Sequence, residues 1–483
     1  MASAGILAFL EAAARGHEMH SFMLVRHGRV VAEHWWHPYG PEHRHTLYSL
    51  SKSFASTAVG LAVAEGRLSV QDRVISFFQE DRPQSLDDNL VALRVKDLLT
   101  MSAGHEKEPT QTMIREKHWV KAFLAAPIKH KPGTVFLYNS GATYMLSAIV
   151  QRVTGQRLVD YLQPRLFAPL GIEGATWETC PRGISIGGWG LSVRTEDIAK
   201  FAQLYLQKGV WQGRPILPAA WVEEATAAQI QQPLPANPSR PNERNDWLQG
   251  YGYQFWRCTH RAYRGDGAFG QYAIVLPEHD AVIAMTSESR NMQGQLDLVW
   301  EHLLPAMSAK PLPPDASAQT RLKALAATLP LPSGQRSAAA AGLVSGKSYR
   351  LEANTLGLEE VRFEFGRRDC EIVFQGPTGR VPLACGYWEW RCGQTALPGT
   401  PPRLVAGGAP PPGTPHKVAT AGAWRDDRTF VAVLRYYETP HHDTLTCRFE
   451  DGRVSLAFMS SIAAMSATPK DPRPALTGRL LSR

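Results

Sequence analysis

Strand-like segments stand at both ends of residues 1–308, with helical spacing between them. Residues 20–36, HSFMLVRHGRVVAEHWW, have the alternation of two strands around a tight turn at His27 and Gly28. Much of residues 50–230 repeats apolar side chains at helical spacing. Three further apolar segments, GYQFWRC, QYAIVLP and DAVIAMTS, begin at Gly252, Gln271 and Asp280. This order favours a sheet assembled from the two ends of the region, with a helical region inserted between them.

The pattern changes after residue 308. A chain of 483 residues is longer than one ordinary domain, so a second domain is expected. Residues 309–344 are rich in Pro, Ser and Ala around a short helical segment and predict a linker. Residues 345–483 contain short alternating segments, such as CEIVF and RTFVAVLRYYE, separated by turn residues. They predict an antiparallel β domain, a barrel or a sandwich.

The composition argues against several classes of protein. Apolar residues make up 44% of the chain, too many for a disordered protein, and no apolar run is long enough to cross a membrane. The net charge of +8 is spread without a block of Lys or Arg, so we expect neither a nucleic-acid nor a membrane partner. The N-terminal segment has no basic start and is interrupted by Glu11, which predicts a cytoplasmic protein.

Metal and redox sites are not predicted. None of the six cysteines stands in a C-x-x-C pair, so we expect reduced, mostly buried thiols. The clustered histidines form no H-E-x-x-H motif. We therefore expect no metal and no cofactor.

A serine and a lysine three residues apart are the first candidates for chemistry. In TLYSLSKSF, residues 46–54, Ser49 comes just before a stretch of helical spacing and Lys52 follows. Residues three apart on a helix share a face, so the amine can approach the hydroxyl. The helix start would stabilise an oxyanion, and partial burial would make the lysine a base. An N-cap serine beside a surface lysine would give the same pattern.

The segment PGTVFLYNS, residues 132–140, is a second motif. Tyr138 falls on a loop just before a helical apolar stripe, where its hydroxyl can point into a cleft, and Ser140 ends the motif. A phenol near a lysine and a helix start would ionise more readily and accept the serine proton. A core tyrosine with a satisfied hydroxyl would look the same.

A third motif is YRGDGAFGQYAI, residues 263–274. Its glycines stand just before or on a strand, where they would let the backbone approach a ligand and supply an oxyanion N–H. A bulge or a tight turn would explain them as well. Trp189, in the glycine-rich sequence GGWG, is expected to line the cleft, although simple packing is the alternative.

Together these motifs resemble the serine β-lactamase and penicillin-binding fold family, above all its class C β-lactamase-like branch. That branch includes D-aminopeptidases, D-alanyl-D-alanine carboxypeptidases, family VIII carboxylesterases and 6-aminohexanoate-dimer hydrolase. The resemblance covers roughly residues 15–305 and includes DLLTMSAGH and GGWGLSVRTEDIAKFAQLYLQKG, which begin at Asp97 and Gly187. It implies an α+β fold, in which an antiparallel sheet is flanked by helices and joined by an all-helical region. The β domain that follows is similar in architecture to the lipocalin-like barrels of D-aminopeptidase relatives.

The resemblance also implies a role for each candidate. Ser49 would be the acylated nucleophile, Lys52 would assist its deprotonation, and Tyr138 would shuttle protons. The N–H groups of Ser49 and Ala268 would form the oxyanion hole. The remaining candidates are expected to bind substrate: Ser140, Trp189, Gly265, Asp266, Gly267 and Ala268.

Two departures from the family pattern bear on the substrate. The tyrosine motif usually ends Y-x-N, and here Ser140 replaces the asparagine. The third motif is usually K-T-G or H-x-G, and here it reads Gly265-Asp266-Gly267. Without the cation, and with an aspartate present, we expect poor hydrolysis of penicillin-like acids, although Arg264 could compensate. These features favour an ester, an amide or a substrate with a free amine.

The predicted function is therefore a serine hydrolase that cleaves a small-molecule ester or amide through an acyl-enzyme on Ser49. The alternatives are a ligand-binding or sensor protein that acylates once and stops, and a β-lactamase or D,D-carboxypeptidase. The sequence leaves open the identity of the substrate, the formation of a homo-oligomer and the role of the β domain.

Overall fold

The computed structural model describes residues 1–235, 239–310, 312–335, 337–376, 379–405 and 413–481. The chain divides into two compact units. Unit 1 comprises Met1–Trp35 and Pro41–Ala326, and unit 2 comprises Trp36–Gly40 and Ala327–Arg483. The division at Ala326 falls inside the segment expected to be a linker, two residues of which, 311 and 336, lie outside the described ranges.

Contacts within each unit explain the position of this division. The helix of the expected linker, α13 (Ala316–Ala324), belongs to unit 1, where Arg321 pairs with Glu11 of helix α1 (Ser3–Gly16). Beyond it, the carbonyl of Leu329 accepts a hydrogen bond from the indole of Trp390 within unit 2. The short segment Trp36–Gly40 also belongs to unit 2, and Tyr39 donates to the carbonyl of Thr439 there.

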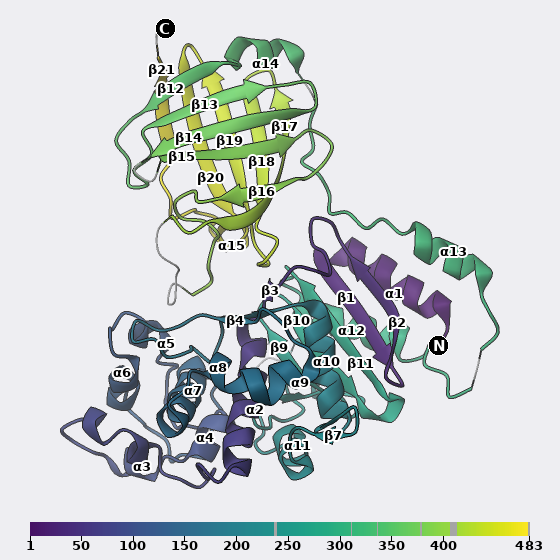
Figure 1. Cartoon of the computed structure of the whole chain (residues 1–483), viewed down its shortest axis with the longest axis vertical. Coiled ribbons are helices and arrows are strands. Elements are labelled where there is room, and N and C mark those ends of the chain that lie inside the picture. The colour runs from purple at the N-terminus through teal and green to yellow at the C-terminus, as the bar shows by residue number, and fades with distance from the viewer. Residues whose placement is uncertain (236–238, 311, 336, 377–378, 406–412, 482–483) are drawn as a thin grey trace. The chain divides into compact units, whose positions relative to one another are not determined.

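A six-stranded antiparallel sheet forms the centre of unit 1, in the order β2-β1-β11-β10-β9-β8. Strand β1 pairs with β11, with Phe22 opposite Met285, so the sheet joins the two ends of the region as predicted. Figure 1 shows the purple β1 and β2 beside the teal β9 to β11. The strands are β1 (Met19–Arg26), β2 (Arg29–Trp35), β8 (Trp256–Arg257), β9 (Tyr263–Gly267), β10 (Gln271–Leu276) and β11 (Ala281–Ser287).

Strand β8 is shorter than the apolar sequence GYQFWRC suggested. Gln254 has a φ of 65°, a left-handed conformation that interrupts an extended strand. The residues before it therefore leave the sheet, and pairing with β9 is limited to Trp256 opposite Arg264 and Arg257 opposite Tyr263.

Helices cover the sheet and build the inserted region. Strands β1, β9, β10 and β11 are buried along their whole length, so both faces of the central sheet are covered. One covering helix is α10 (Thr195–Leu206), which packs on β1, β10 and β11. Another is α1, whose Phe9 ring centroid lies 4.8 Å from that of Phe22. The remaining helices of unit 1 are α2 (Ser51–Ala64), α3 (Asp88–Ala92), α4 (Val95–Leu99), α5 (Thr110–Met113), α6 (Trp119–Ala125), α7 (Ser140–Thr154), α8 (Leu158–Leu162), α9 (Ala168–Leu170), α10 (Thr195–Leu206), α11 (Ala219–Thr226) and α12 (Met292–Leu298).

Two small sheets complete unit 1. Three short strands, in the order β3-β5-β4, tie the segment before Ser49 to the glycine-rich turn at residues 187–190. The main chain continues this pairing, since the N–H of Leu47 donates to the carbonyl of Leu191. The strands are β3 (His45–Thr46), β4 (Thr176–Trp177), β5 (Leu191–Val193) and the separate pair β6 (Val210–Trp211) and β7 (Arg214–Pro215).

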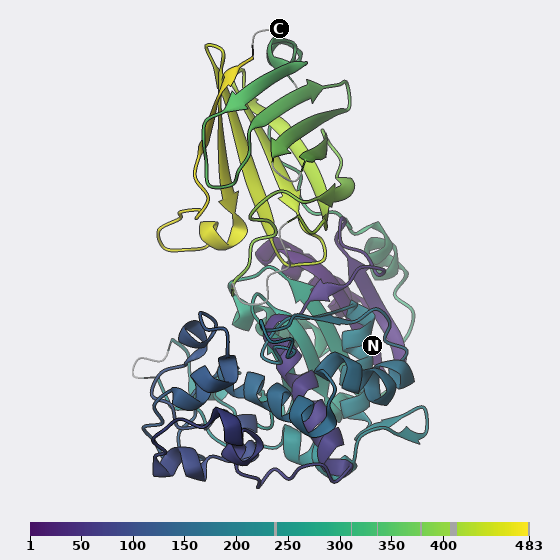
Figure 2. The ribbon, with the colours of Figure 1, turned by 60° about the vertical axis from the view of Figure 1, so that its left-hand side comes forward.

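Unit 2 is the predicted β domain and forms a barrel. Its sheet runs β15-β14-β13-β12-β21-β20-β19-β18-β17-β16, and a pairing of β15 with β17 closes it. Figures 1 and 2 show green strands in one wall and yellow strands in the other. The elements are α14 (Ala338–Val344), β12 (Lys347–Leu351), β13 (Glu360–Phe365), β14 (Asp369–Gly376), β15 (Gly379–Gly386), β16 (Arg391–Thr395), β17 (His416–Asp426), β18 (Thr429–Arg435), β19 (His442–Glu450), β20 (Arg453–Ser460), α15 (Ser461–Ala464) and β21 (Leu476–Leu480).

Bulky side chains fill the barrel. Phe363, Trp424 and Phe449 are buried in one cluster, with the Phe363 and Phe449 rings 4.9 Å apart. Alternate residues of each strand point inward, which explains the alternating burial of β19 and β20. Separately, within the described part of the chain, no helix combines the length and the apolar character needed to span a membrane.

Helix α2 gives a stability prediction, because it is buried on nearly all sides. A Cβ added at Gly60 would lie 2.5 Å from the ring of the buried Trp221. Replacement of Gly60 with Ala should therefore lower the free energy of unfolding by about 1–3 kcal/mol, although alanine favours helices. The matched control is Gly16→Ala, also in a helix of unit 1, where a Cβ meets nothing within 4 Å. If urea unfolding gave the two variants the same free energy of unfolding, that result would contradict the close contact between Gly60 and Trp221.

Candidate active site

Ser49 lies at the junction of a turn and a buried helix. It occupies the 3-10 turn η1 (Tyr48–Leu50), which runs directly into α2. The helix itself thus starts two residues after Ser49, within the usual variation of helix ends. Tyr48 has a φ of 48°, an unusual conformation for a residue with a side chain, immediately before the nucleophile candidate.

Lys52 is buried beneath Ser49, with an exposed fraction of 1%. Its Nζ lies 3.1 Å from Ser49 Oγ, 3.0 Å from Ser140 Oγ and 2.7 Å from the carbonyl oxygen of Gly188. Burial lowers the pKa of Lys52 to about 7, against the opposing influence of nearby carboxylates. The expectation that burial lowers the proton affinity of this lysine is confirmed. Both the amine and the ammonium are therefore populated near neutral pH.

Tyr138 completes the group, on the loop before α7. Its ring centroid lies 4.8 Å from Lys52 Nζ, and its hydroxyl forms a hydrogen bond with the side chain of Ser49. Burial, reinforced by the charge of Asp266, raises the pKa of Tyr138 far above its usual value. The expectation that this phenol ionises readily is therefore wrong. Of the two groups, Lys52 therefore loses its proton at the lower pH, and Tyr138 stays protonated.

Ser140 begins helix α7 and is anchored from two sides. Its main-chain N–H donates to Glu108 Oε1 at 2.9 Å, while its hydroxyl contacts Lys52. Asn139 caps the helix, since its side-chain oxygen accepts from the N–H of Ala142. Sequence reasoning missed Glu108, which stands in a polar loop with no periodic pattern.

The two glycines of the third motif lie against the segment that carries Ser49. A Cβ at Gly267 would lie 2.0 Å from the carbonyl oxygen of Leu47, and one at Gly265 would lie 2.5 Å from the side chains of Leu50 and Ser53. Their close approach is thus to the protein's own chain. Both lie on β9, at the edge where β8 has already ended.

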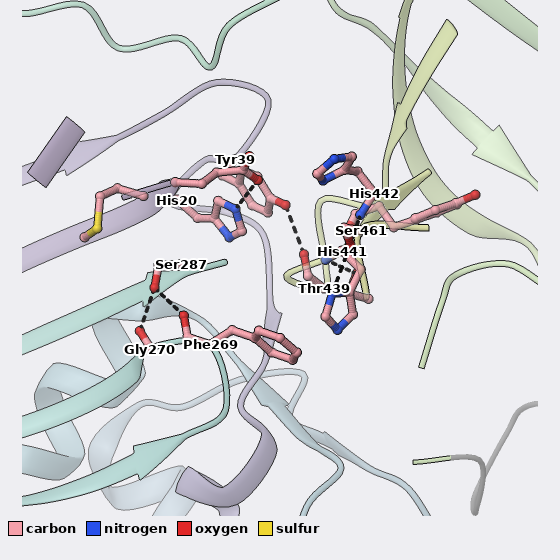
Figure 3. A network of polar contacts seen from close by, with 12 residues as sticks. His20, Tyr39, Phe269, Gly270, Ser287, Thr439, His441, His442 and Ser461 are labelled. Carbon is pink, nitrogen blue, oxygen red and sulfur yellow. Dashed lines mark hydrogen bonds and ion pairs between the residues drawn. The ribbon is translucent and has the colours of Figure 1, made fainter. Parts of the chain in front are cut away.

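The turn after β9, residues 268–270, is fixed by hydrogen bonds from two side chains. Ser287 Oγ contacts the carbonyl oxygens of Phe269 at 2.6 Å and Gly270 at 3.1 Å, as the dashed lines in Figure 3 show. Gln271 Nε2 donates to the carbonyl of Ala268 at 2.9 Å. Ala268, the first residue of this turn, is partly exposed. The turn is therefore fixed where an oxyanion N–H is expected, and that role of Ala268 stays a prediction.

Asp266 is paired with a buried arginine. Its Oδ2 lies 2.9 Å from Arg264 Nε. The guanidinium of Arg264 has no exposed surface and lies 4.4 Å from the Trp247 ring centroid. It also donates to the carbonyl of Asp246 and to Cys258 Sγ. Arg264 thus balances the charge of Asp266 but presents no surface to solvent.

Trp189 lies in the interior, beside Trp119, at a ring-centroid distance of 6.1 Å. Its carbonyl accepts from the indole of Trp177 at 2.9 Å. This is the placement of a packed side chain, the alternative considered for it. The preceding residue contributes to the site instead, since the Gly188 carbonyl contacts Lys52.

Gln254 is a second residue that sequence reasoning missed. Its Oε1 accepts from Thr143 of α7, and its main-chain carbonyl accepts from Ser53 of α2. Its Nε2 donates to the carbonyls of Leu98 and Leu99. The side-chain amide of Gln254 thereby joins α7 to α4, and its main-chain carbonyl holds α2, the helix of Lys52, beside them. A lone glutamine in an apolar stretch was the only signal.

Comparison with known proteins agrees with this geometry. The family model described as Beta-lactamase matches residues 12–304. The 6-aminohexanoate-dimer hydrolase of Paenarthrobacter ureafaciens is 28% identical over 288 residues, which cover 55% of this chain and 72% of that protein. The D-aminopeptidase of Brucella anthropi is 26% identical over 164 residues, covering 32% of this chain and 31% of that protein.

A solved structure extends the likeness to both units. The octameric penicillin-binding protein homologue from Pyrococcus abyssi covers 98% of this chain and 99% of its own, with a TM-score of 0.50 and 15% identity. At this identity the match concerns the fold alone. Ser49, Lys52, Tyr138 and Ser140 all fall within the segment that the family model matches, and the chain belongs to the β-lactamase family of serine hydrolases.

Proposed function

We propose that this protein hydrolyses a small-molecule ester or amide through an acyl-enzyme on Ser49. One observation carries the proposal: the Ser49 hydroxyl lies between a buried amine at 3.1 Å and a protonated phenol. A hydroxyl is a weak nucleophile until a neighbouring base takes its proton. Lys52 is such a base, because burial leaves part of its population neutral near pH 7.

The proton transfers can be followed atom by atom. Lys52 takes the proton of Ser49 as the serine oxygen bonds to the substrate carbonyl carbon, and the N–H groups of Ser49 and Ala268 receive the oxyanion. Tyr138 then gives its proton to the leaving group and recovers one from the Lys52 ammonium. Water attacks the acyl-serine by the same route in reverse, which releases the acid and restores the hydroxyl.

Two features support the substrate class, and a third bears on the oligomeric state. The names of the relatives, a 6-aminohexanoate-dimer hydrolase and a D-aminopeptidase, support amide substrates. The pairing of Arg264 with Asp266 leaves the third motif without an exposed cation, which argues against a carboxylate anchor of the kind that penicillin-like acids need. The octameric assembly of the Pyrococcus abyssi homologue supports a homo-oligomer here, whereas the cytoplasmic location stays a prediction.

The first test removes the nucleophile. Replacement of Ser49 with Ala should abolish turnover of p-nitrophenyl acetate, by at least about 10³-fold in kcat/KM, because the acyl-enzyme cannot form without the Ser49 hydroxyl. Ser85→Ala, in an exposed loop of the same unit, is the matched control and should retain full activity. Equal activity of the two variants would overturn the assignment of Ser49.

The second test is the pH dependence. The pKa of Lys52 is lowered to about 7, so below that pH the amine is an ammonium that cannot accept the serine proton. For a neutral ester, kcat/KM should therefore rise with pH through a midpoint near 7 and then level off. A profile that is flat between about pH 5.5 and 8.5 would exclude Lys52 as the base.

The third test separates a hydrolase from a protein that acylates once. Intact-mass spectrometry after mixing with an ester or a β-lactam should show the wild-type mass restored within the time of turnover. Tyr138→Phe keeps the ring but removes the hydroxyl. With p-nitrophenyl acetate, whose phenolate leaves without a proton, this variant should accumulate the adduct because the attack of water still needs the proton transfer through Tyr138. A persistent adduct on the wild-type protein would instead indicate the sensor function.

A further inference from the structure

Glu108 lies beside the proposed active site, on the loop between α4 and α5. It is partly buried. Its Oε1 accepts a hydrogen bond from the main-chain N–H of Ser140 at 2.9 Å and from the hydroxyl of Thr110. The charge of Glu108 also acts on Lys52, where it favours the protonated amine. The proton transfers described above do not use this residue.

Ser140 connects Glu108 to the lysine. Its N–H is held by the carboxylate, and its hydroxyl lies 3.0 Å from Lys52 Nζ. A carboxylate at the first residue of a 15-residue helix is also favoured by the helix dipole. Glu108 therefore fixes the start of α7 at the point where that helix touches the lysine.

The charged and titratable groups that face Lys52 come from three segments. They are Glu108, Tyr138 and Asp266. Tyr138 is uncharged at neutral pH, and Asp266 is paired with Arg264 at 2.9 Å. The hydrogen bonds of Glu108 Oε1 come from neutral donors. Of the two carboxylates, Glu108 is thus the one whose negative charge is not balanced by a paired guanidinium.

We propose that Glu108 is a positioning residue that holds Ser140 against Lys52 and supplies the negative charge that stabilises the lysine ammonium formed during acylation. The inference rests on the proposed role of Ser49 and Lys52. Glu108 never touches the substrate in this scheme. It acts through the N–H of Ser140 and through its field at the amine, a group buried enough for that field to be weakly screened.

The test replaces Glu108 with Gln, which keeps an acceptor for Ser140 but removes the charge. Without that charge the ammonium is less stable, so the midpoint of the kcat/KM profile should move to lower pH by about 0.5–1 unit. The plateau at high pH should fall, because a weaker base takes the proton less readily. Glu108→Asp keeps the charge and should return the midpoint toward the wild-type value.

Glu106→Gln is the matched control. Glu106 is exposed, two residues away on the same loop, and its removal should leave the midpoint unchanged. A merely structural role of Glu108 would lower activity at every pH without moving the midpoint. That outcome, in a variant with an unchanged melting temperature, would overturn the proposal.

A measurement without substrate keeps this inference separate from the proposed function. In protein labelled with ¹³C-lysine, the Cε resonance of Lys52 is identified by its loss in Lys52→Met and titrated directly. Its midpoint should fall in Glu108→Gln and stay unchanged in Glu106→Gln. If turnover does not depend on Ser49 but this shift appears, the proposed function fails while the charge role of Glu108 stands. Equal midpoints in both variants would refute that role.

Discussion

The active site depends on the burial of one amine. Lys52 lies in the interior of unit 1, and an amine placed there must find acceptors or lose its proton. Its three contacts come from separate segments: Ser49 in the turn before α2, Ser140 at the start of α7, and Gly188 in a glycine-rich turn. The same contacts that compensate the buried nitrogen therefore bring Ser49 and the tyrosine loop together. The compensation is incomplete, and the resulting low pKa of Lys52 suits the role of base proposed for it.

The surrounding fold can be understood as the support for those three contacts. Small residues let elements approach closely: Gly265 and Gly267 let β9 lie on the chain around Ser49, and Gly188 leaves room for the carbonyl of Ser140. Pairing of β3 with β5 ties the Ser49 segment to the Gly188 turn. Gln254 joins α4 and α7 through its side-chain amide and α2 through its main-chain carbonyl. None of these groups takes part in the proposed proton transfers. They restrict the movement of Ser49, Lys52 and Tyr138, which is the condition for a preorganised site.

The sequence was sufficient to predict the sheet, the β domain and the meeting of Ser49, Lys52 and Tyr138, whose catalytic roles stay predictions. It was insufficient for the residues around those three. Strand alternation and helical spacing are local signals, so the union of the two chain ends in one sheet and the barrel could be predicted. Ser49, Lys52 and Tyr138 stand in recognisable motifs at helix starts. The contacts of Glu108 and Gln254 form only when segments that are distant in the sequence meet in the fold. No spacing of residues along the chain predicts such contacts. The ionisation of Tyr138 was mispredicted for the same reason, because its burial and the nearby Asp266 are properties of the folded site. The inclusion of Trp36–Gly40 in unit 2 likewise has no local signal.

The two departures from the family pattern, Ser140 and the Gly265-Asp266-Gly267 motif, have the same physical consequence. Where the family has an asparagine, Ser140 offers a short hydroxyl to Lys52 and its main-chain N–H to Glu108. Where the family has a cation or an imidazole, this chain has Gly265. The adjacent Asp266 is paired with Arg264, whose guanidinium lies against the rings of Trp247 and Trp256. Ser140 and Asp266 thus interact with Lys52, Glu108 and Arg264 of the protein itself rather than with a ligand. Neither of these two positions offers an exposed cation to a substrate carboxylate. This arrangement agrees with the proposed preference for neutral or amine-bearing esters and amides over penicillin-like acids, independently of the names of the relatives.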